Sequence, residues 1–244
     1  MNYQISLIGG GPGAWDLITL RGLDRLRAAD VIIADHLGPT QALDKLLDAE
    51  KLASVELIDA SKLPYGRQMA QERINELMIE KAKAGLKVAR LKGGDPYVFG
   101  RGFEEMEALT KEGLSVEVIP GVTSAISVPE IDGVAVTVRG VVHNFTVISG
   151  HLPPGHPQSL NNWEALAKTN GTLVVIMGVK NGGAIAEALI SHGLTESTPV
   201  AIIQEGTTKG QRSFRCDLAG LGKTIEQEEI KPPAVIVIGK VAGL

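Results

Sequence analysis

The chain has 244 residues, of which 44% are hydrophobic and 21% are charged, values that are typical of a globular protein with a substantial core. Its formal net charge of −4 argues against a nucleic-acid-binding surface, and its single cysteine, Cys216, excludes an intramolecular disulfide. No apolar stretch approaches the roughly 18 residues of a membrane span, and the N-terminus lacks a signal-peptide pattern. We therefore expect a cytoplasmic protein without a cysteine-based zinc site, and we expect no other bound metal.

Short apolar runs alternate with longer amphipathic stretches along the chain. This alternation predicts strand–helix units and a largely parallel sheet. The turn at Pro120-Gly121 then suggests a boundary between domains 1–120 and 121–244. The expected strands are 5–8, 31–34, 55–58, 88–91 and 115–119, and the expected helices are 16–28, 41–47, 71–84 and 102–111.

The second half repeats this alternation less regularly. One clear helix covers 184–191 and closes at His192-Gly193, where glycine can supply a left-handed cap. Residues 150–161, with three prolines and two histidines, read as a surface loop. The expected strands are 145–149, 172–177, 200–204 and 234–239.

A glycine-rich turn, Gly9-Gly10-Gly11-Pro12-Gly13-Ala14, follows the first strand. It satisfies the G-x-G-x-x-A dinucleotide pattern, and Asp35 stands where that pattern places its ribose-binding acid. Pro12 counts against a pyrophosphate site because proline has no N–H to donate. A dinucleotide site, a site for another ligand and a plain structural turn all remain open on these residues.

A second glycine turn follows the strand 88–91. Gly93 and Gly94 would let main chain approach a ligand closely at the carboxyl end of the strand, where ligands bind in open α/β sheets. Asp95 could accept hydrogen bonds from a ligand or could cap the turn before Pro96. Arg101, next to Glu104 and Glu105, could bind a carboxylate or pair with these acids, and the spacing does not decide between the two.

These turns belong to a set of motifs that occur in one order along the chain. The most specific motif is R-L-K-G-G-D-P-Y-V-F-G-R at Arg90–Arg101. The others are Gly11-Pro12-Gly13, Leu20-Arg21-Gly22-Leu23, Ala34-Asp35-His36-Leu37, Pro120-Gly121-Val122-Thr123-Ser124-Ala125, Ser149-Gly150-His151, 172–178 and 234–239. Over nearly its whole length the chain resembles the uroporphyrinogen-III C-methyltransferase family, within the larger class of cobalt-precorrin methyltransferases.

The resemblance implies an α/β fold of two αβα lobes with the active site in the cleft between them. It implies S-adenosyl-L-methionine as methyl donor, S-adenosyl-L-homocysteine as its product, and no dinucleotide at Gly9–Ala14. The implied reaction methylates uroporphyrinogen III at C2 and C7 to give precorrin-2, on the way to sirohaem and cobalamin, and the family is usually homodimeric. The implied cofactor-binding residues are Pro12, Gly93, Gly94, Asp95, Val98, Thr123, Ser124, Met177 and Gly206.

The resemblance also implies catalytic and substrate-binding groups. Asp35 matches the family's proposed proton acceptor and Lys62 its proposed proton donor. Because the substrate carries carboxylates and arginine binds these with a two-pronged fork, Arg67, Arg101 and Arg139 are the substrate candidates, while His151 is a ligand or a surface residue. Between residues 62 and 101, nine Lys/Arg (62, 67, 73, 81, 83, 87, 90, 92, 101) outnumber four Asp/Glu (72, 76, 80, 95), an excess that a basic pocket or a solvated helix face would explain.

Several residues depart from the family pattern and put the identity of the substrate in more doubt than that of the cofactor. A related precorrin methyltransferase with another tetrapyrrole substrate is therefore one alternative. A nicotinamide-dependent oxidoreductase that uses the turn at Gly9–Ala14 is another, and a binding protein without turnover is a third. The departures are Ala14, Ala34, His36, Phe103 and Val138.

Overall fold

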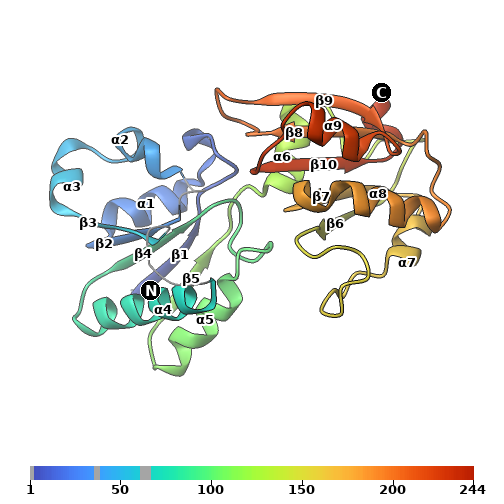
Figure 1. Ribbon diagram of the computed structural model, residues 1–244. Coiled ribbons are helices and arrows are strands. Elements are labelled where there is room, and N and C mark those ends of the chain that lie inside the picture. Colours follow the sequence, from blue (N-terminus) through green and yellow to red (C-terminus); the bar gives the residue numbers. More distant parts are fainter. Residues whose placement is uncertain (1–2, 36–38, 61–66) are drawn as a thin grey trace. The chain divides into compact units, whose positions relative to one another are not determined.

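The computed structural model describes residues 3–35, 39–60 and 67–244. The chain divides into two compact units, Met1–Thr123 and Ser124–Leu244. In Figure 1 the first unit runs from blue to green and the second from green to red. Each unit is built on its own five-stranded sheet, which confirms the expected α/β class.

The sheet of the first unit is entirely parallel, with strand order β3-β2-β4-β1-β5. All residues of β1, β2 and β4 are buried, as expected for a parallel sheet covered on both faces. The strands are β1 (Ile5–Gly9), β2 (Val31–Ala34), β3 (Glu56–Asp59), β4 (Val88–Lys92) and β5 (Val116–Ile119).

Helices cover both faces of this sheet (Figure 1). On one face α4 and α5 pack Met78 and Leu109 against the strands. On the other, α1 and α2 contribute Leu26 and Leu43 to a second core cluster. The helices are α1 (Leu20–Ala28), α2 (Leu43–Leu46), α3 (Ala49–Ser54), α4 (Arg67–Lys83) and α5 (Gly102–Lys111), with short 3₁₀ turns at Trp15–Leu17 and Pro39–Ala42.

The helix expected over 16–28 is in fact two elements. A 3₁₀ turn, Trp15–Leu17, follows the glycine-rich turn, and α1 begins only at Leu20. The Thr19 side chain accepts a hydrogen bond from the Gly22 N–H at 3.2 Å and so caps the helix. The apolar spacing extends across both elements, which is why periodicity alone merged them.

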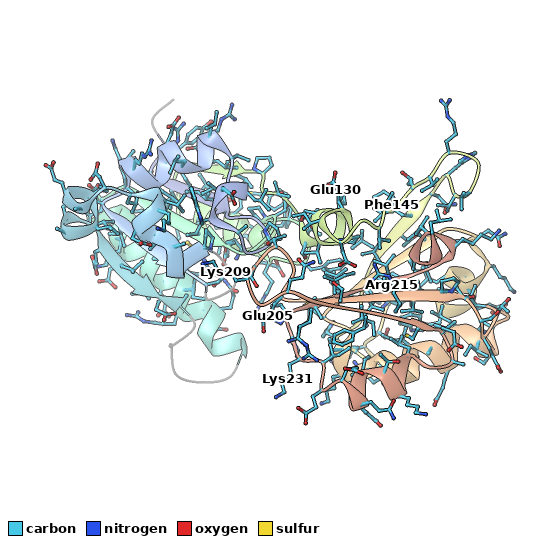
Figure 2. The ribbon with its side chains drawn as sticks, turned by 90° about the horizontal axis from the view of Figure 1, so that it is seen from above. Glu130, Phe145, Glu205, Lys209, Arg215 and Lys231 are labelled. Atoms are coloured by element: carbon cyan, nitrogen blue, oxygen red, sulfur yellow. The ribbon has the colours of Figure 1, made fainter. Side chains whose placement is uncertain are left out.

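The sheet of the second unit is mixed, so the expectation of a largely parallel sheet is wrong for this half. Its order is β6-β7-β10-β8-β9, in which β10 runs antiparallel to both neighbours and β8 and β9 are antiparallel. Figure 2 shows Glu205 and Lys209 on the loop that joins β8 and β9. The strands are β6 (Phe145–Ser149), β7 (Thr172–Ile176), β8 (Pro199–Gln204), β9 (Arg212–Asp217) and β10 (Ala234–Ile238).

This second sheet is also covered on both faces. Trp163, Ile185 and Leu221, from three different helices, pack on one face, while Ala125 and Val128 of α6 pack on the other. The helices are α6 (Ser124–Ile131), α7 (Trp163–Lys168), α8 (Gly182–Ser191) and α9 (Leu221–Gln227), with 3₁₀ turns at Val179–Asn181 and Lys240–Gly243. In the part of the chain that is described, no helix has the length and apolar character needed to cross a membrane.

Candidate functional site

The neighbouring strands β1 and β4 form a topological switch point. After β1 the chain crosses one face of the sheet through α1 to reach β2, and after β4 it crosses the opposite face through α5 to reach β5. Adjacent parallel strands whose connections leave in opposite directions open a crevice at their carboxyl ends. Both glycine turns, Gly9–Ala14 and Gly93–Pro96, lie at the carboxyl ends of these two strands.

Three glycine backbones pack directly on one another at this edge. A Cβ on Gly121 would lie 2.2 Å from the Gly94 carbonyl oxygen and 2.6 Å from the Gly9 Cα. The turns that follow β1, β4 and β5 therefore touch main chain to main chain. Only glycine permits such an approach.

Backbone hydrogen bonds tie the first two turns together. The Gly10 N–H donates to the Lys92 carbonyl at 2.8 Å, and Gly11 and Gly94 exchange N–H···O bonds of 3.2 and 2.6 Å. Since Pro12 has no N–H, three successive residues of the first turn have no amide to offer a pyrophosphate. The helix that should point at that group begins only at Leu20. This geometry does not support the dinucleotide interpretation.

Asp95 joins the second turn to the third. One carboxylate oxygen, Oδ1, accepts the Tyr97 N–H at 2.8 Å, and the other, Oδ2, accepts the Gly121 N–H at 3.0 Å. The capping role that the sequence allowed is thus present. Because a carboxylate has about four acceptor positions, these two bonds leave room for a further donor.

Asp35 follows β2 at the same edge and belongs to a cluster of charged groups. Its Oδ1 accepts a hydrogen bond from Arg90 Nη2 at 2.6 Å, and its Oδ2 lies 4.0 Å from Lys92 Nζ. Both cations also contact the Glu105 Oε1, at 3.2 Å from Arg90 Nε and 2.9 Å from Lys92 Nζ. The side chains of Arg90, Lys92 and Glu105 are 2%, 3% and 0% exposed, whereas that of Asp35 is 30% exposed.

Burial and charge act differently on the two cations of this cluster. For Arg90, burial opposes ionisation, but the carboxylates of Glu105 and Asp35 outweigh it and raise the pKa of the guanidinium. For Lys92, burial and the neighbouring Arg90 charge lower the pKa, against the opposing effect of the two carboxylates. Arg90 is therefore the permanent cation beside Asp35.

The sequence interpretation missed this cluster. It counted Arg90 and Lys92 in a basic excess that suggested a pocket or a solvated face, and it placed Glu105 with Glu104 beside Arg101. A signal was available, since Arg90 and Lys92 alternate with buried apolar residues in a strand whose five positions are all buried. Charges in such a strand must find partners inside the protein.

The segment after Asp95 carries the remaining candidates of the first unit. Val98 is half-buried, while Arg101 is exposed and lies 3.7 Å from Glu104 in a loose ion pair. Phe103, on the first turn of α5, is 57% exposed and makes an edge-on contact with the Tyr97 ring, with 6.0 Å between centroids. These exposed side chains can contact a ligand without rearrangement of the core.

Candidates in the second unit also gather at one sheet edge. The directions of the strands put the carboxyl ends of β6, β7 and β8 together, and these ends carry His151, Met177 and Gly206 respectively. Met177 is 49% exposed with a positive φ of 56°. Gly206 is buried, and a Cβ there would meet Val128 Cγ1 at 2.4 Å, so packing against α6 already requires this glycine.

Backbone strain is concentrated at these edges. Seven non-glycine residues in the described part of the chain have positive φ, and five of them follow β4, β7 or β8. Such conformations cost energy and cluster at ligand-binding and catalytic sites. The five residues are Phe99, Arg101, Met177, Glu205 and Thr207.

For the other predicted site residues the structure gives position and exposure but few contacts. Lys62 and His36 lie outside the described residues, and Arg67 begins α4. Pro12 is half-buried, Thr123 ends the first unit, and Ser124 begins α6. Arg139 is exposed in the turn that the bridge between Val138 and Val142 closes. Of the other departures, Ala14 precedes the Trp15–Leu17 turn, Ala34 is buried at the end of β2, and Val138 packs on the core cluster that contains Ala125 and Val128 of α6.

Comparison with known proteins identifies this arrangement. The family model for tetrapyrrole (corrin/porphyrin) methylases matches residues 4–222. The chain belongs to this family. It is 44% identical to the S-adenosyl-L-methionine-dependent uroporphyrinogen III methyltransferase of Methanosarcina barkeri, over 100% of this chain and 94% of that protein.

Two further relatives agree with this assignment. The uroporphyrinogen-III C-methyltransferase of Methanocaldococcus jannaschii is 42% identical over 100% of this chain and 98% of its own. The solved structure of uroporphyrin-III C-methyltransferase from Thermus thermophilus, complexed with S-adenosylhomocysteine, superposes with a TM-score of 0.79 at 32% identity. It covers 98% of this chain and 92% of that one. The family resemblance seen in the sequence is confirmed.

Proposed function

We propose that this tetrapyrrole methylase is an S-adenosyl-L-methionine-dependent uroporphyrinogen-III C-methyltransferase that methylates C2 and C7 to give precorrin-2. The observation that carries the proposal is the match of more than 40% identity, over the whole chain, to two uroporphyrinogen-III methyltransferases. The backbone N–H groups of Gly10 and Gly11 already donate hydrogen bonds within the protein, so they are not available to the pyrophosphate of a nicotinamide dinucleotide. The product would serve sirohaem synthesis and, further on, cobalamin synthesis.

The residues at the two sheet edges fit such a methyl donor. Glycine backbones without Cβ atoms stand at the β1/β4 switch point, and the Asp95 carboxylate has acceptor capacity for an ammonium or hydroxyl group. Strained, exposed Met177 fits a contact with an apolar part of the ligand. We assign cofactor binding to Pro12, Gly93, Gly94, Asp95, Val98, Thr123, Ser124, Met177 and Gly206.

The bound donor supplies a methyl group that its sulfonium already activates, so the protein's contribution is mainly orientation and proton removal. When a C–C bond forms at the pyrrole carbon, the S–CH₃ bond breaks and the positive charge passes to the macrocycle. One proton must then leave to restore neutrality. Asp35 is the proposed acceptor, since its carboxylate is part-exposed and is held by Arg90. Lys62 is the proposed donor.

Arginine side chains are the proposed anchors for the substrate's carboxylates. Among the described residues the Arg101 side chain forms one ion pair, a 3.7 Å contact with the exposed Glu104 that costs little to exchange for a ligand carboxylate. Arg139 is exposed and lies in a turn, where a ligand carboxylate can reach it. Arg67 completes the proposed set. We further propose that the enzyme is a cytoplasmic homodimer.

Incubation with uroporphyrinogen III and methyl-labelled S-adenosyl-L-methionine tests this function. We expect label in a dimethylated tetrapyrrole, and a parallel calorimetric titration should detect S-adenosyl-L-homocysteine but not NAD(P)H. If label enters another precorrin but not uroporphyrinogen III, the proposed substrate is wrong and the proposed methyl-transfer reaction stands. Binding of the cofactor without transfer to any tetrapyrrole would instead identify a binding protein without turnover.

A further inference from the structure

The four charged side chains of the cluster around Asp35 differ sharply in their exposure to solvent. Two cations and one carboxylate, from Arg90, Lys92 and Glu105, are almost completely enclosed, and Asp35 is the single member of the four that solvent reaches. Any proton or ligand charge that interacts with the cluster from outside therefore does so through Asp35.

One oxygen organises the cluster. Glu105 Oε1 accepts from Arg90 Nε at 3.2 Å, from Lys92 Nζ at 2.9 Å and from Gln71 Nε2 at 3.0 Å. Arg90 in turn donates from Nη1 to the Ile33 and Leu91 carbonyls, at 3.4 and 3.3 Å, and from Nη2 to Asp35. The guanidinium plane is held from several directions, so the position of the Asp35 carboxylate is determined by groups deeper in the protein.

Stability does not account for these charges. Buried ion pairs are often matched or exceeded in stability by apolar side chains of similar volume, because desolvation offsets their attraction. Here the desolvation is incompletely compensated, since Glu105 Oε2 is buried and has no hydrogen-bond partner among the described residues. A cluster that is costly to bury and opens to solvent at one carboxylate calls for a functional explanation.

We propose that Arg90, Lys92 and Glu105 are positioning residues that keep the Asp35 carboxylate ionised and oriented to accept the proton released on methylation. This inference rests on the proposed function. Arg90 supplies the charge and the hydrogen bond that favour the ionised form, and Glu105 fixes the guanidinium and limits the excess of positive charge. Lys92 completes the balance at two cations to two carboxylates.

The charged and polar groups around Asp35 come from each neighbouring element. Strand β4 contributes Arg90 and Lys92, α5 contributes Glu105, and α4 contributes the neutral Gln71. Asp59 ends the adjacent strand β3 in register with Ala34. Within the described part of the chain, Arg90 and Lys92 of β4 each form an ion pair with the Asp35 carboxylate at 4.0 Å or less.

Two variants should have opposite effects on the pH profile of kcat/KM, in which the acid limb is the fall in rate as Asp35 becomes protonated at low pH. Arg90→Met removes a positive charge next to Asp35, so protonation becomes easier and the limb should move to higher pH by roughly one unit. Glu105→Gln keeps the shape but removes a negative charge, so the two cations act on Asp35 alone and the limb should move to lower pH. Arg90→Lys, which retains the charge, should restore the wild-type limb with a reduced kcat.

A matched control is available on α4. Arg73 forms a 3.1 Å ion pair with Glu76, and both side chains are exposed. Arg73→Met makes the same chemical change outside the cluster and should leave the profile unchanged. If Arg90 and Glu105 have only a structural role, Arg90→Met and Glu105→Gln would lower the rate at every pH and would not move the acid limb in opposite directions. That outcome would overturn the inference.

The same effect can be read without turnover. In protein with ¹³C-labelled aspartate carboxyl groups, the Asp35 resonance is assigned by its loss in Asp35→Asn, and its change with pH is followed in each variant. Opposite displacements for Arg90→Met and Glu105→Gln support the inference even if uroporphyrinogen III proves not to be the substrate. Identical titrations in the wild type and both variants refute it even if methyl transfer is confirmed.

Discussion

The contact between glycine backbones at the switch point makes Gly121→Ala an informative perturbation. The added Cβ would meet the Gly94 oxygen at 2.2 Å and the Gly9 Cα at 2.6 Å, and neither can rotate away because both are main chain. The turn after β5 must therefore move away from the other two. That movement stretches the 3.0 Å hydrogen bond from the Gly121 N–H to Asp95 Oδ2.

The expected cost follows from these two effects. Overpacking costs about 1–3 kcal/mol, and weakening a hydrogen bond to a charged acceptor adds about 1–2 kcal/mol. Reduced flexibility of the unfolded chain returns about 0.5–1 kcal/mol. We expect Gly121→Ala to lower the free energy of unfolding by roughly 1–4.5 kcal/mol and to weaken binding of S-adenosyl-L-homocysteine more than tenfold.

Urea unfolding and calorimetric titration measure the two quantities. Gly183→Ala is the matched control, since Gly183 lies inside α8 and a Cβ there has ordinary contact, with the Gly222 Cα at 3.5 Å. This control should be neutral or slightly stabilising. A free energy of unfolding of Gly121→Ala within about 0.5 kcal/mol of the wild-type value, together with normal binding of S-adenosyl-L-homocysteine by the variant, would refute this reasoning. The close approach of the three turns would then not be a requirement of the site.

Three further predictions concern single side chains. Asp35→Asn should reduce kcat by at least about 100-fold while the affinity for S-adenosyl-L-homocysteine changes little, because the amide cannot accept the proton; an equal loss of both would make Asp35 a cofactor ligand. Arg101→Met should raise the KM for the tetrapyrrole with the free energy of unfolding unchanged within about 0.5 kcal/mol, since its pair with Glu104 is exposed and loose; an unchanged KM would remove it from the substrate site. Thr19→Ala should lower the free energy of unfolding by about 1 kcal/mol through loss of the α1 cap, and Thr19→Ser should restore it in the same urea titration.

The sequence determined the family and most of the first unit. Motifs such as Arg90–Arg101 identified a tetrapyrrole methylase before any fold was known, and strands of short apolar runs stood out because a parallel sheet buries both of its faces. The expected elements at Val31–Ala34, Gly102–Lys111 and Phe145–Ser149 agree with the structure to the residue.

The second unit was harder to read because its signals are weaker. Strand β9, Arg212–Asp217, is a polar edge strand that pairs only with β8 and has no buried residue. Helix α6 contains Pro129, which ordinarily argues against a helix, and α7 has only six residues. Nor does local sequence reveal strand direction, so the antiparallel insertion of β10 became visible only in the sheet.

What tertiary structure alone decided is the role of charge at the site. In the sequence, three charged residues of the site look like surface residues: Arg90, Lys92 and Glu105. Glu105 in particular stands next to the exposed Glu104. Folding buries these three because β4 is central and α5 packs over it, and it brings them to Asp35, which is 55 residues from Arg90 along the chain. Burial and pairing depend on contacts between distant segments, so a surface charge can be told from a buried, paired charge only once the chain has folded.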